Sequence, residues 1–310
     1  MDSESYDIAI VGGGAAGLSA ALVLGRARRR VVVIDAGEPR NAPAQHMQGF
    51  LSRDGMPPAQ LLAAARDEVR GYGVALVSDR VVDATPGFAL TLASGRTIAA
   101  RQVLLTTGAV DELPDVEGAR ERWGRDLLHC PYCHGWEVRD QQIGVLGTGP
   151  ASVDHAHLLR QWSDDVVLFT HTHPVDASER ATLEARGIRV VDGRVERLVV
   201  SDDHLEGVKL AGGPCVSRDA LFIRPALVPH ADDPAAALGC EVGDDGLVRT
   251  GPDGRTSVPG VWAAGNATNP RAQVITAVGE GSAVAIAINT QLVSDDVAAA
   301  VSHVTAAGAA

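Results

Sequence analysis

The N-terminal segment carries the pattern that most restricts how this chain can fold. Residues 7–11 (DIAIV) form a short apolar run rich in β-branched side chains, which predicts a buried strand. A glycine-rich turn at residues 12–17 (GGGAAG) follows at once, and then an Ala- and Leu-rich helix. A second predicted strand covers residues 31–34 (VVVI) and ends in Asp35. This order of elements is typical of a dinucleotide-binding fold.

Each part of such a turn has a physical role. Gly12 permits the tight turn, Gly14 lets a pyrophosphate approach the backbone, and Gly17 lets the helix pack on the strand. The N-terminus of the helix then faces the phosphates. Asp35, about 20 residues further on, can accept hydrogen bonds from a ribose. We therefore predict a nucleotide site here rather than an ordinary glycine turn.

The same order of elements begins again near residue 143. The stretch IGVLGTGPAS predicts a strand and a turn, followed by a helix over 153–162 and a strand over 166–169. The fold class predicted is α/β, with two Rossmann-like folds, the second inserted into the first. We expect residues 1–112 and 242–310 to form the first domain, residues 113–241 the second, and residues 273–292 a long helix.

Composition narrows the classes of function. The 310 residues carry a formal net charge of −12, which argues against nucleic acid as a partner, because phosphate binding needs a clustered basic surface. The N-terminus shows no signal-peptide pattern, and no uninterrupted apolar run approaches membrane-spanning length. We expect a cytoplasmic protein that does not enter a membrane. Four cysteines in such a setting do not form a structural disulfide framework.

Residues 129–137 (HCPYCHGWE) contain a Cys-x-x-Cys pair, for which several chemistries are open. Haem attachment uses Cys-x-x-Cys-His but is expected in exported proteins. Zinc needs four ligands, and the chain has no second close cysteine pair. His129 and His134 directly adjoin the cysteines, which is poor chelate geometry, so no metal site is expected. A purely structural pair of buried thiols is a further alternative. We favour a redox disulfide formed by Cys130 and Cys133.

Several ordered motifs together resemble the low-molecular-weight thioredoxin-reductase family of flavoproteins. They are the GGGAAG turn with Asp35, TTGA at residues 106–109, CPYC, the second glycine turn, and VPGVWAAGNATNPRAQVITAVGEG from residue 258. The resemblance implies FAD bound by the first fold and the C-terminal segment. It implies that the cofactor is contacted by Gly12, Gly14, Ala15, Ala16, Gly17, Asp35, Ala36, Arg40, Asn41, His46, Val82, Gly108, Ala109, Gly265, Asn266, Ala272, Gln273 and Val274.

The resemblance also assigns roles around the cysteine pair. Cys133 is implied to exchange electrons with the flavin, and Cys130 to meet the substrate sulfur. Ordinary members of the family carry an acid after the second cysteine, where this chain has His134. Histidine titrates near neutral pH and suits the same proton transfer. The alternative is that His134 only hydrogen-bonds the loop. Family members commonly have Asp where this chain has Asn266, which can still hydrogen-bond a hydroxyl group.

The second glycine turn is degraded, which bears on the electron partner. Its third glycine is replaced by Ser152, and the next strand runs into FTHTHPVDASE, with no arginine before Arg180 to hold a 2′-phosphate. Together with CPYCHGWE, this resembles the dithiol oxidases of gliotoxin- and holomycin-type biosynthesis. We expect a small-molecule dithiol as substrate, O2 as acceptor and a homodimer. The alternatives are an NADPH- or ferredoxin-dependent disulfide reductase and a flavin-bearing redox sensor.

Overall fold

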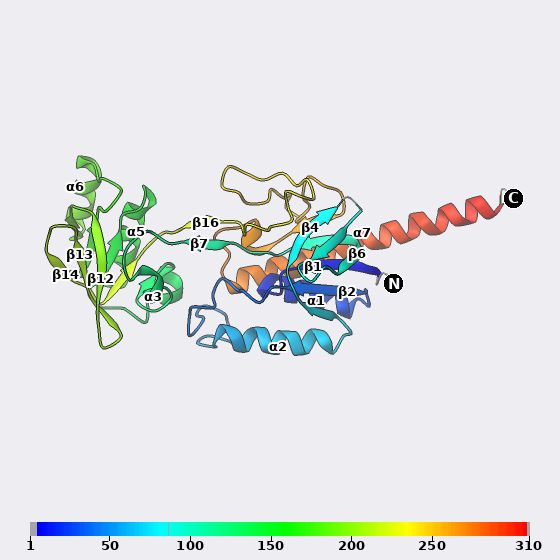
Figure 1. The fold of residues 1–310 in the computed structure, drawn as a ribbon, viewed down its shortest axis with the longest axis horizontal. Helices are drawn as coiled ribbons and strands as arrows, with labels where there is room; N and C mark the ends of the chain where they lie inside the picture. Colours follow the sequence, from blue (N-terminus) through cyan, green and yellow to red (C-terminus); the bar gives the residue numbers. More distant parts are fainter. Residues whose placement is uncertain (1–4, 86, 309–310) are drawn as a thin grey trace. The chain divides into compact units, whose positions relative to one another are not determined.

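The computed structural model describes residues 5–85 and 87–308, which divide into two compact units (Figure 1). Unit 1 comprises residues 1–40, 59–110 and 227–310, and unit 2 comprises residues 41–58 and 111–226. Two of the passages of the chain between the units lie in β7 (Val110–Glu112) and β16 (Ala226–Val228), which pair as a two-stranded sheet. The inserted second fold predicted from the sequence is therefore present.

Unit 1 is built on a seven-stranded sheet in the order β3-β2-β1-β6-β5-β4, with β17 also paired to β6. Strands β3, β2, β1, β6 and β17 run parallel, whereas β5 and β4 are antiparallel. The strands are β1 (Ser5–Val11), β2 (Val31–Asp35), β3 (Ala75–Ser78), β4 (Val81–Thr85), β5 (Ala89–Leu92), β6 (Thr97–Leu105) and β17 (Val261–Ala263). The helices are α1 (Ala15–Arg26), α2 (Pro58–Arg70), η1 (Gly265–Ala267) and α7 (Val274–Gly308).

Unit 2 contains a parallel five-stranded sheet, in the order β11-β10-β9-β15-β8, and a separate antiparallel sheet, β12-β13-β14. The parallel sheet consists of β8 (Leu127–Leu128), β9 (Ile143–Leu146), β10 (Val166–Phe169), β11 (Arg189–Val191) and β15 (Ala220–Phe222). The second sheet consists of β12 (Val195–Ser201), β13 (His204–Leu210) and β14 (Cys215–Ser217). The helices are α3 (Ala119–Arg122), α4 (Pro131–His134), α5 (Ala151–Leu159) and α6 (Ala177–Ala185).

The predicted strands at both glycine turns are confirmed, but two segments differ from expectation. The chain returns to unit 1 at Leu227 rather than at residue 242, because Ala235, Leu238 and Cys240 are buried in the core of that unit. Residues 41–58, expected in the first domain, group instead with unit 2. In both cases the division follows packing, which the motifs do not encode.

The last helix is longer than predicted. Instead of ending at residue 292, α7 continues to Gly308, since its added residues are mostly Ala and Val and include no proline (Figure 1). By length and hydropathy, residues Val274–Ala306 could cross a membrane, contrary to the expectation of no such segment. The first half of α7 is instead a core helix, because Ala285, Ile288 and Leu292 are fully buried with residues of α1.

Candidate active site

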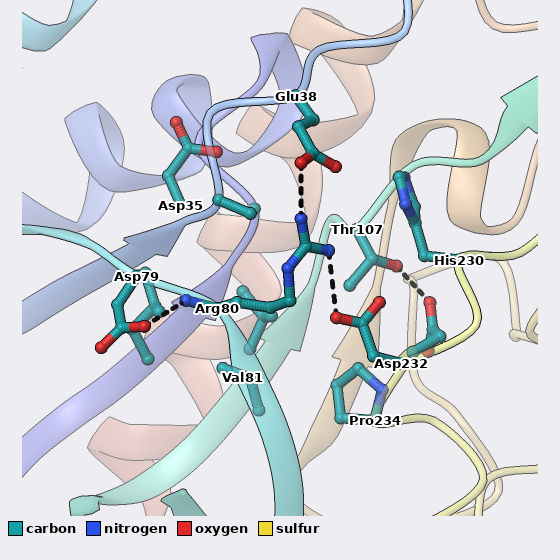
Figure 2. A pocket seen from close by; sticks show the side chains of 14 residues that line it. Asp35, Glu38, Asp79, Arg80, Val81, Thr107, His230, Asp232 and Pro234 are labelled. Atoms are coloured by element: carbon teal, nitrogen blue, oxygen red, sulfur yellow. Dashed lines mark hydrogen bonds and ion pairs between the residues drawn. The ribbon is translucent and has the colours of Figure 1, made fainter. Parts of the chain in front are cut away.

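A pocket lies in unit 1 where β1 and β2 end and α1 begins. Figure 2 shows its side chains, contributed by the glycine turn, the ends of β2 and β6, the start of β4 and a segment after β16. Its lining consists of Val11, Gly12, Ile34, Asp35, Ala36, Glu38, Asp79, Arg80, Val81, Thr107, His230, Asp232, Asp233 and Pro234. Ligands of open α/β sheets bind at this carboxyl edge of the strands.

The glycine turn has the geometry that a phosphate needs. Gly12 adopts a φ of +105°, and a Cβ atom there would lie 2.3 Å from the carbonyl oxygen of Thr106. A Cβ atom at Gly17 would lie 2.0 Å from the Gly12 oxygen, so α1 packs directly on the turn. A Cβ atom at Gly14 would meet nothing within 4 Å. No side chain of the described residues caps α1 at Gly14, so this N-terminus can receive an anion.

Asp35 is held at the end of β2, beside the turn. Its Oδ2 atom accepts a hydrogen bond of 3.0 Å from Nη2 of Arg66, and its Oδ1 atom accepts one of 3.3 Å from the Gly37 amide. A Cβ atom at Gly13 would lie 2.7 Å from the Asp35 carboxylate. The carboxylate therefore lies where a ribose attached to a phosphate on the turn can reach it.

Sequence patterns missed a polar network across the pocket. Arg80 donates to Asp232 at 3.0 Å and pairs with Glu38 at 2.7 Å (Figure 2). These hydrogen bonds, to Glu38 and then to Asp232, raise the pKa of Arg80. Thr107 donates to Asp233 at 2.5 Å. Apart from Thr107, which lies in the TTGA stretch, these residues belong to no motif recognised in the sequence. Asp232 and Asp233 come from the segment after β16, which was assigned from the sequence to the other domain.

A first group of the predicted cofactor residues lies at or near the pocket, and a few lie apart from it. Gly12, Asp35 and Ala36 line the pocket, and Gly14, Ala15, Ala16 and Gly17 form the adjoining turn and helix start. Val82 is 49% exposed on β4, whereas its neighbour Val81 is buried and lines the pocket, because successive strand residues face opposite sides. Gly108 and Ala109 follow β6 directly. Outside the pocket lining, in unit 2, lie Asn41 and His46.

A second group of predicted residues meets at the start of α7. The Asn266 amide donates to the carbonyl oxygens of Asn269 (2.9 Å) and Ala272 (3.2 Å), and its oxygen accepts from Arg40 at 3.3 Å. The carboxylate of Glu280 accepts a hydrogen bond of 2.9 Å from the Gly265 amide. Asn266 thus fixes the loop that leads into α7, where Gln273 and Val274 lie.

In unit 2, Cys130 and Cys133 form a disulfide across a single helical turn, α4. Their Cα atoms lie 5.2 Å apart, within the usual range for a disulfide. Pro131 occupies the first helical position, and the amides of Cys133 and His134 both donate to the carbonyl oxygen of Cys130 at 3.1 Å. Tyr132, between the two cysteines, and Trp136, three residues after the second, are each 66% exposed. The disulfide therefore sits in a rigid turn with two exposed aromatic rings beside it.

His134 completes this turn, half-buried at the end of α4. Burial lowers its pKa below the ordinary value of 6.5, and the nearby Glu137 carboxylate offsets this only in part. The imidazole is therefore neutral at pH 7 and able to accept a proton.

His155 lies behind the turn, on α5, and is only 4% exposed. Burial lowers its pKa to about 3, with smaller effects from His129 and Arg224. The unfolded chain would bind this proton near pH 6.5, so as the pH falls from 6.5 toward 3 the folded state loses stability.

We expect this one histidine to cost about 2 kcal/mol of folding free energy at pH 5 relative to pH 8. A His155→Gln variant lacks the titrating group and should lose that much less on acidification. Urea unfolding of both proteins at the two pH values measures the difference. Equal losses in the two proteins would show that His155 does not stay neutral in the fold.

The second glycine turn, between β9 and α5, is closed by its own chain. The amides of Thr172 and His173 donate to the Gly147 carbonyl oxygen at 3.1 and 3.2 Å. The Thr148 amide donates to the Ser152 hydroxyl at 3.2 Å, and Pro150, at the helix N-cap, has no N–H group. The Ser152 amide donates to the Gly149 carbonyl oxygen at 3.0 Å, so among the backbone donors of this turn those of Thr148 and Ser152 are bonded internally and Pro150 has none.

The first arginine after β10 is held in an ion pair. Arg180, the first arginine after β10, pairs with both carboxylate oxygens of Asp192 at 2.8 and 2.9 Å. Arg194 lies near His171 and, after burial, helps to lower the pKa of that histidine. Among residues 5–85 and 87–308, no three His, Cys, Asp or Glu side chains gather as metal ligands.

Comparison with known proteins gives matches along nearly the whole chain. A family model described as pyridine nucleotide-disulphide oxidoreductase matches residues 6–281. Thioredoxin reductase sirT of Leptosphaeria maculans is 32% identical, covering 95% of this chain and 96% of its own. Thioredoxin reductase tcpT of Claviceps purpurea (strain 20.1) is 33% identical, covering 94% and 96%. The crystal structure of HlmI is 53% identical, with a TM-score of 0.93 over 97% of this chain and 96% of that one.

Proposed function

Because the chain belongs to the pyridine nucleotide-disulphide oxidoreductase family, we propose that it is an FAD-dependent dithiol oxidase. It would join the two thiols of a small molecule in a disulfide and pass the electrons to O2. The observation that carries this proposal is the contrast between the two glycine turns. The turn at residues 12–17 starts α1 with no side-chain cap, whereas in the turn at residues 147–152 the Thr148 and Ser152 amides are bonded internally and Pro150 has none. The unit with this second turn carries an intact Cys130–Cys133 pair.

The residues of unit 1 fit FAD. The open space at Gly14, the uncapped start of α1 and the Asp35 carboxylate suit a pyrophosphate joined to a ribose. The segment fixed by Asn266 and Glu280 carries further residues that the resemblance assigns to this cofactor. Bound there, FAD would take an electron pair from the reduced cysteines and deliver it to O2 as H2O2.

The sulfur chemistry follows the rules of thiol–disulfide exchange. A substrate thiolate attacks the Sγ atom of Cys130, the Cys130–Cys133 bond breaks, and Cys133 leaves as a thiolate. The second substrate thiolate then attacks the substrate sulfur of this mixed disulfide and releases Cys130. The substrate thereby loses two electrons and two protons and becomes a disulfide, and the electrons remain on the cysteine pair. Loss of those electrons to the cofactor re-forms the Cys130–Cys133 bond.

His134 is the proton acceptor that we assign to this sequence. It follows Cys133 directly, and its lowered pKa keeps the imidazole neutral and ready to deprotonate the substrate thiol. The rate of dithiol oxidation should therefore hold as the pH falls to 6.5 and decline only below, as the imidazole becomes protonated.

We expect His134→Gln to lower the rate by about 10²-fold or more and to remove the decline in rate below pH 6.5. Initial rates between pH 5 and 8.5 measure both effects, and His204→Gln, an exposed histidine on β13, is the matched control. A His134→Gln profile that matches the wild type would leave His134 with only a hydrogen-bonding role.

The stoichiometry of turnover tests the proposed function. With a small dithiol and air, one H2O2 should form per disulfide, and added NADPH should change neither rate nor yield. An absolute requirement for NADPH would favour the alternative function, a disulfide reductase, which the names of sirT and tcpT support.

We also propose that the protein is a homodimer. The outer part of α7 exposes an uncharged row of β-branched side chains, Ile286, Val293, Val297 and Val301, at spacings of seven and four residues. Light scattering should give a molar mass of twice 32.2 kDa. A mass of 32.2 kDa would contradict this assembly.

A further inference from the structure

Helix α5 and the turn that follows it present two side chains to the redox turn that the proposed chemistry does not use. His155 lies within α5, and Trp162 lies seven residues further on, in the turn after Leu159, where its amide donates to the Leu159 carbonyl oxygen at 2.9 Å. Residues seven apart in a helix lie on the same face. One face of this segment therefore contacts the turn at two points.

Trp162 supports the C-terminal end of the turn. A Cβ atom at Gly135 would lie 2.9 Å from two ring carbons of Trp162, so only glycine lets the chain pass so close to this ring. The Tyr132 ring, between the two cysteines, meets Trp162 edge-on with centroids 5.7 Å apart. The Trp162 carbonyl oxygen also accepts a hydrogen bond of 2.8 Å from the Asp140 amide.

His155 supports the N-terminal end of the turn. Its ring lies against the backbone of His129, the residue before Cys130, and packs edge-on against Phe222 at 5.9 Å. The Nδ1 atom is buried and makes no hydrogen bond within the described residues, which leaves Nε2 as the nitrogen that can reach His129. In a neutral ring Nε2 can carry the proton and donate a hydrogen bond to the His129 carbonyl oxygen.

We propose that His155 and Trp162 are positioning residues, which hold the two ends of the Cys130–Cys133 turn and keep the two sulfur atoms close in the reduced enzyme. Two thiols held together have a high effective concentration for each other, which favours the disulfide. Loosening either end lets the reduced turn spread and shifts the equilibrium toward the dithiol. The inference rests on the redox role of the pair in the proposed function, but not on which acceptor takes the electrons.

The experiment equilibrates the whole flavoprotein anaerobically with glutathione buffers and measures the fraction of Cys130–Cys133 disulfide by alkylation and mass spectrometry. His155→Phe removes the donor but keeps a ring, and His155→Gln restores a donor. Trp162→Ala removes the support, and Trp162→Phe keeps a ring against Gly135. His157→Phe, on the same helix but bonded to Thr182, is the control.

We expect His155→Phe and Trp162→Ala to shift the equilibrium about tenfold toward the dithiol, which corresponds to about 30 mV. His155→Gln, Trp162→Phe and His157→Phe should stay within about threefold of the wild type. Thermal melts identify any variant that fails to fold. If the variants of one residue fail to fold, those of the other residue, at the opposite end of the turn, test the proposal. The proposal is overturned if the folded variants keep the wild-type equilibrium, or if His155→Gln shifts it as far as His155→Phe does. No turnover is required, so failure of the oxidase assignment would be seen separately.

Discussion

Replacing Cys130 with serine should abolish dithiol oxidation, with a loss of at least about 10³-fold in rate, because no mixed disulfide can then form with the substrate. Cys133→Ser should cause an equal loss, because a single remaining cysteine cannot form the Cys130–Cys133 disulfide again after each turnover. The two cysteines act as one unit, so the double variant should be no worse than either single variant. Oxygen consumption with a small dithiol measures all three.

Cys215→Ser is the matched control for these variants. Cys215 is an exposed free thiol on β14, in the same unit as the redox turn. Its replacement should leave the rate unchanged. If Cys130→Ser retained full activity, dithiols would be reducing the cofactor directly, and the relay through the cysteine pair would be wrong.

Gly14→Ala should fold normally and yet lose FAD. The added methyl group meets no protein atom within 4 Å, so packing tolerates it, but it fills the space through which a pyrophosphate must approach the turn. We expect the affinity for FAD to fall at least about tenfold, which is the scale of one lost close phosphate contact of about 1.4 kcal/mol. Flavin absorbance of the purified protein and titration of the apoprotein with FAD measure the loss.

Gly149→Ala provides the matched control in the second glycine turn. A Cβ atom at Gly149 also meets nothing within 4 Å, so the two substitutions are sterically alike. If the second turn binds no nucleotide, Gly149→Ala should keep its flavin and its rate. Normal flavin content in Gly14→Ala would place the pyrophosphate elsewhere, and a loss of rate in Gly149→Ala would indicate a working second site.

The sequence predicted those parts of the molecule that local chemistry determines. The glycine turns at residues 12–17 and 147–152 were found because a tight approach of backbone to backbone, or of backbone to phosphate, requires glycine at fixed spacing. The Cys130–Cys133 pair was found because its spacing is short. In both cases the residues that act together are also neighbours in the chain.

The site residues and the domain boundary that the sequence did not predict depend on contacts between distant segments. Arg80 joins Glu38 and Asp232, and the segment that carries Asp232 was assigned to the wrong domain because no motif marks the return of the chain at Leu227. His155 reads in the sequence as one residue of an ordinary helix. Only the fold brings it against His129.

The measurement that tests the central claim most directly is anaerobic reduction of the flavin, followed by absorbance. A small dithiol should bleach the flavin of the wild-type protein, NADPH should not, and admission of air should restore the colour with formation of H2O2. Rapid bleaching by NADPH would contradict the account, because it would require a working nucleotide site in unit 2 and would make the protein a reductase.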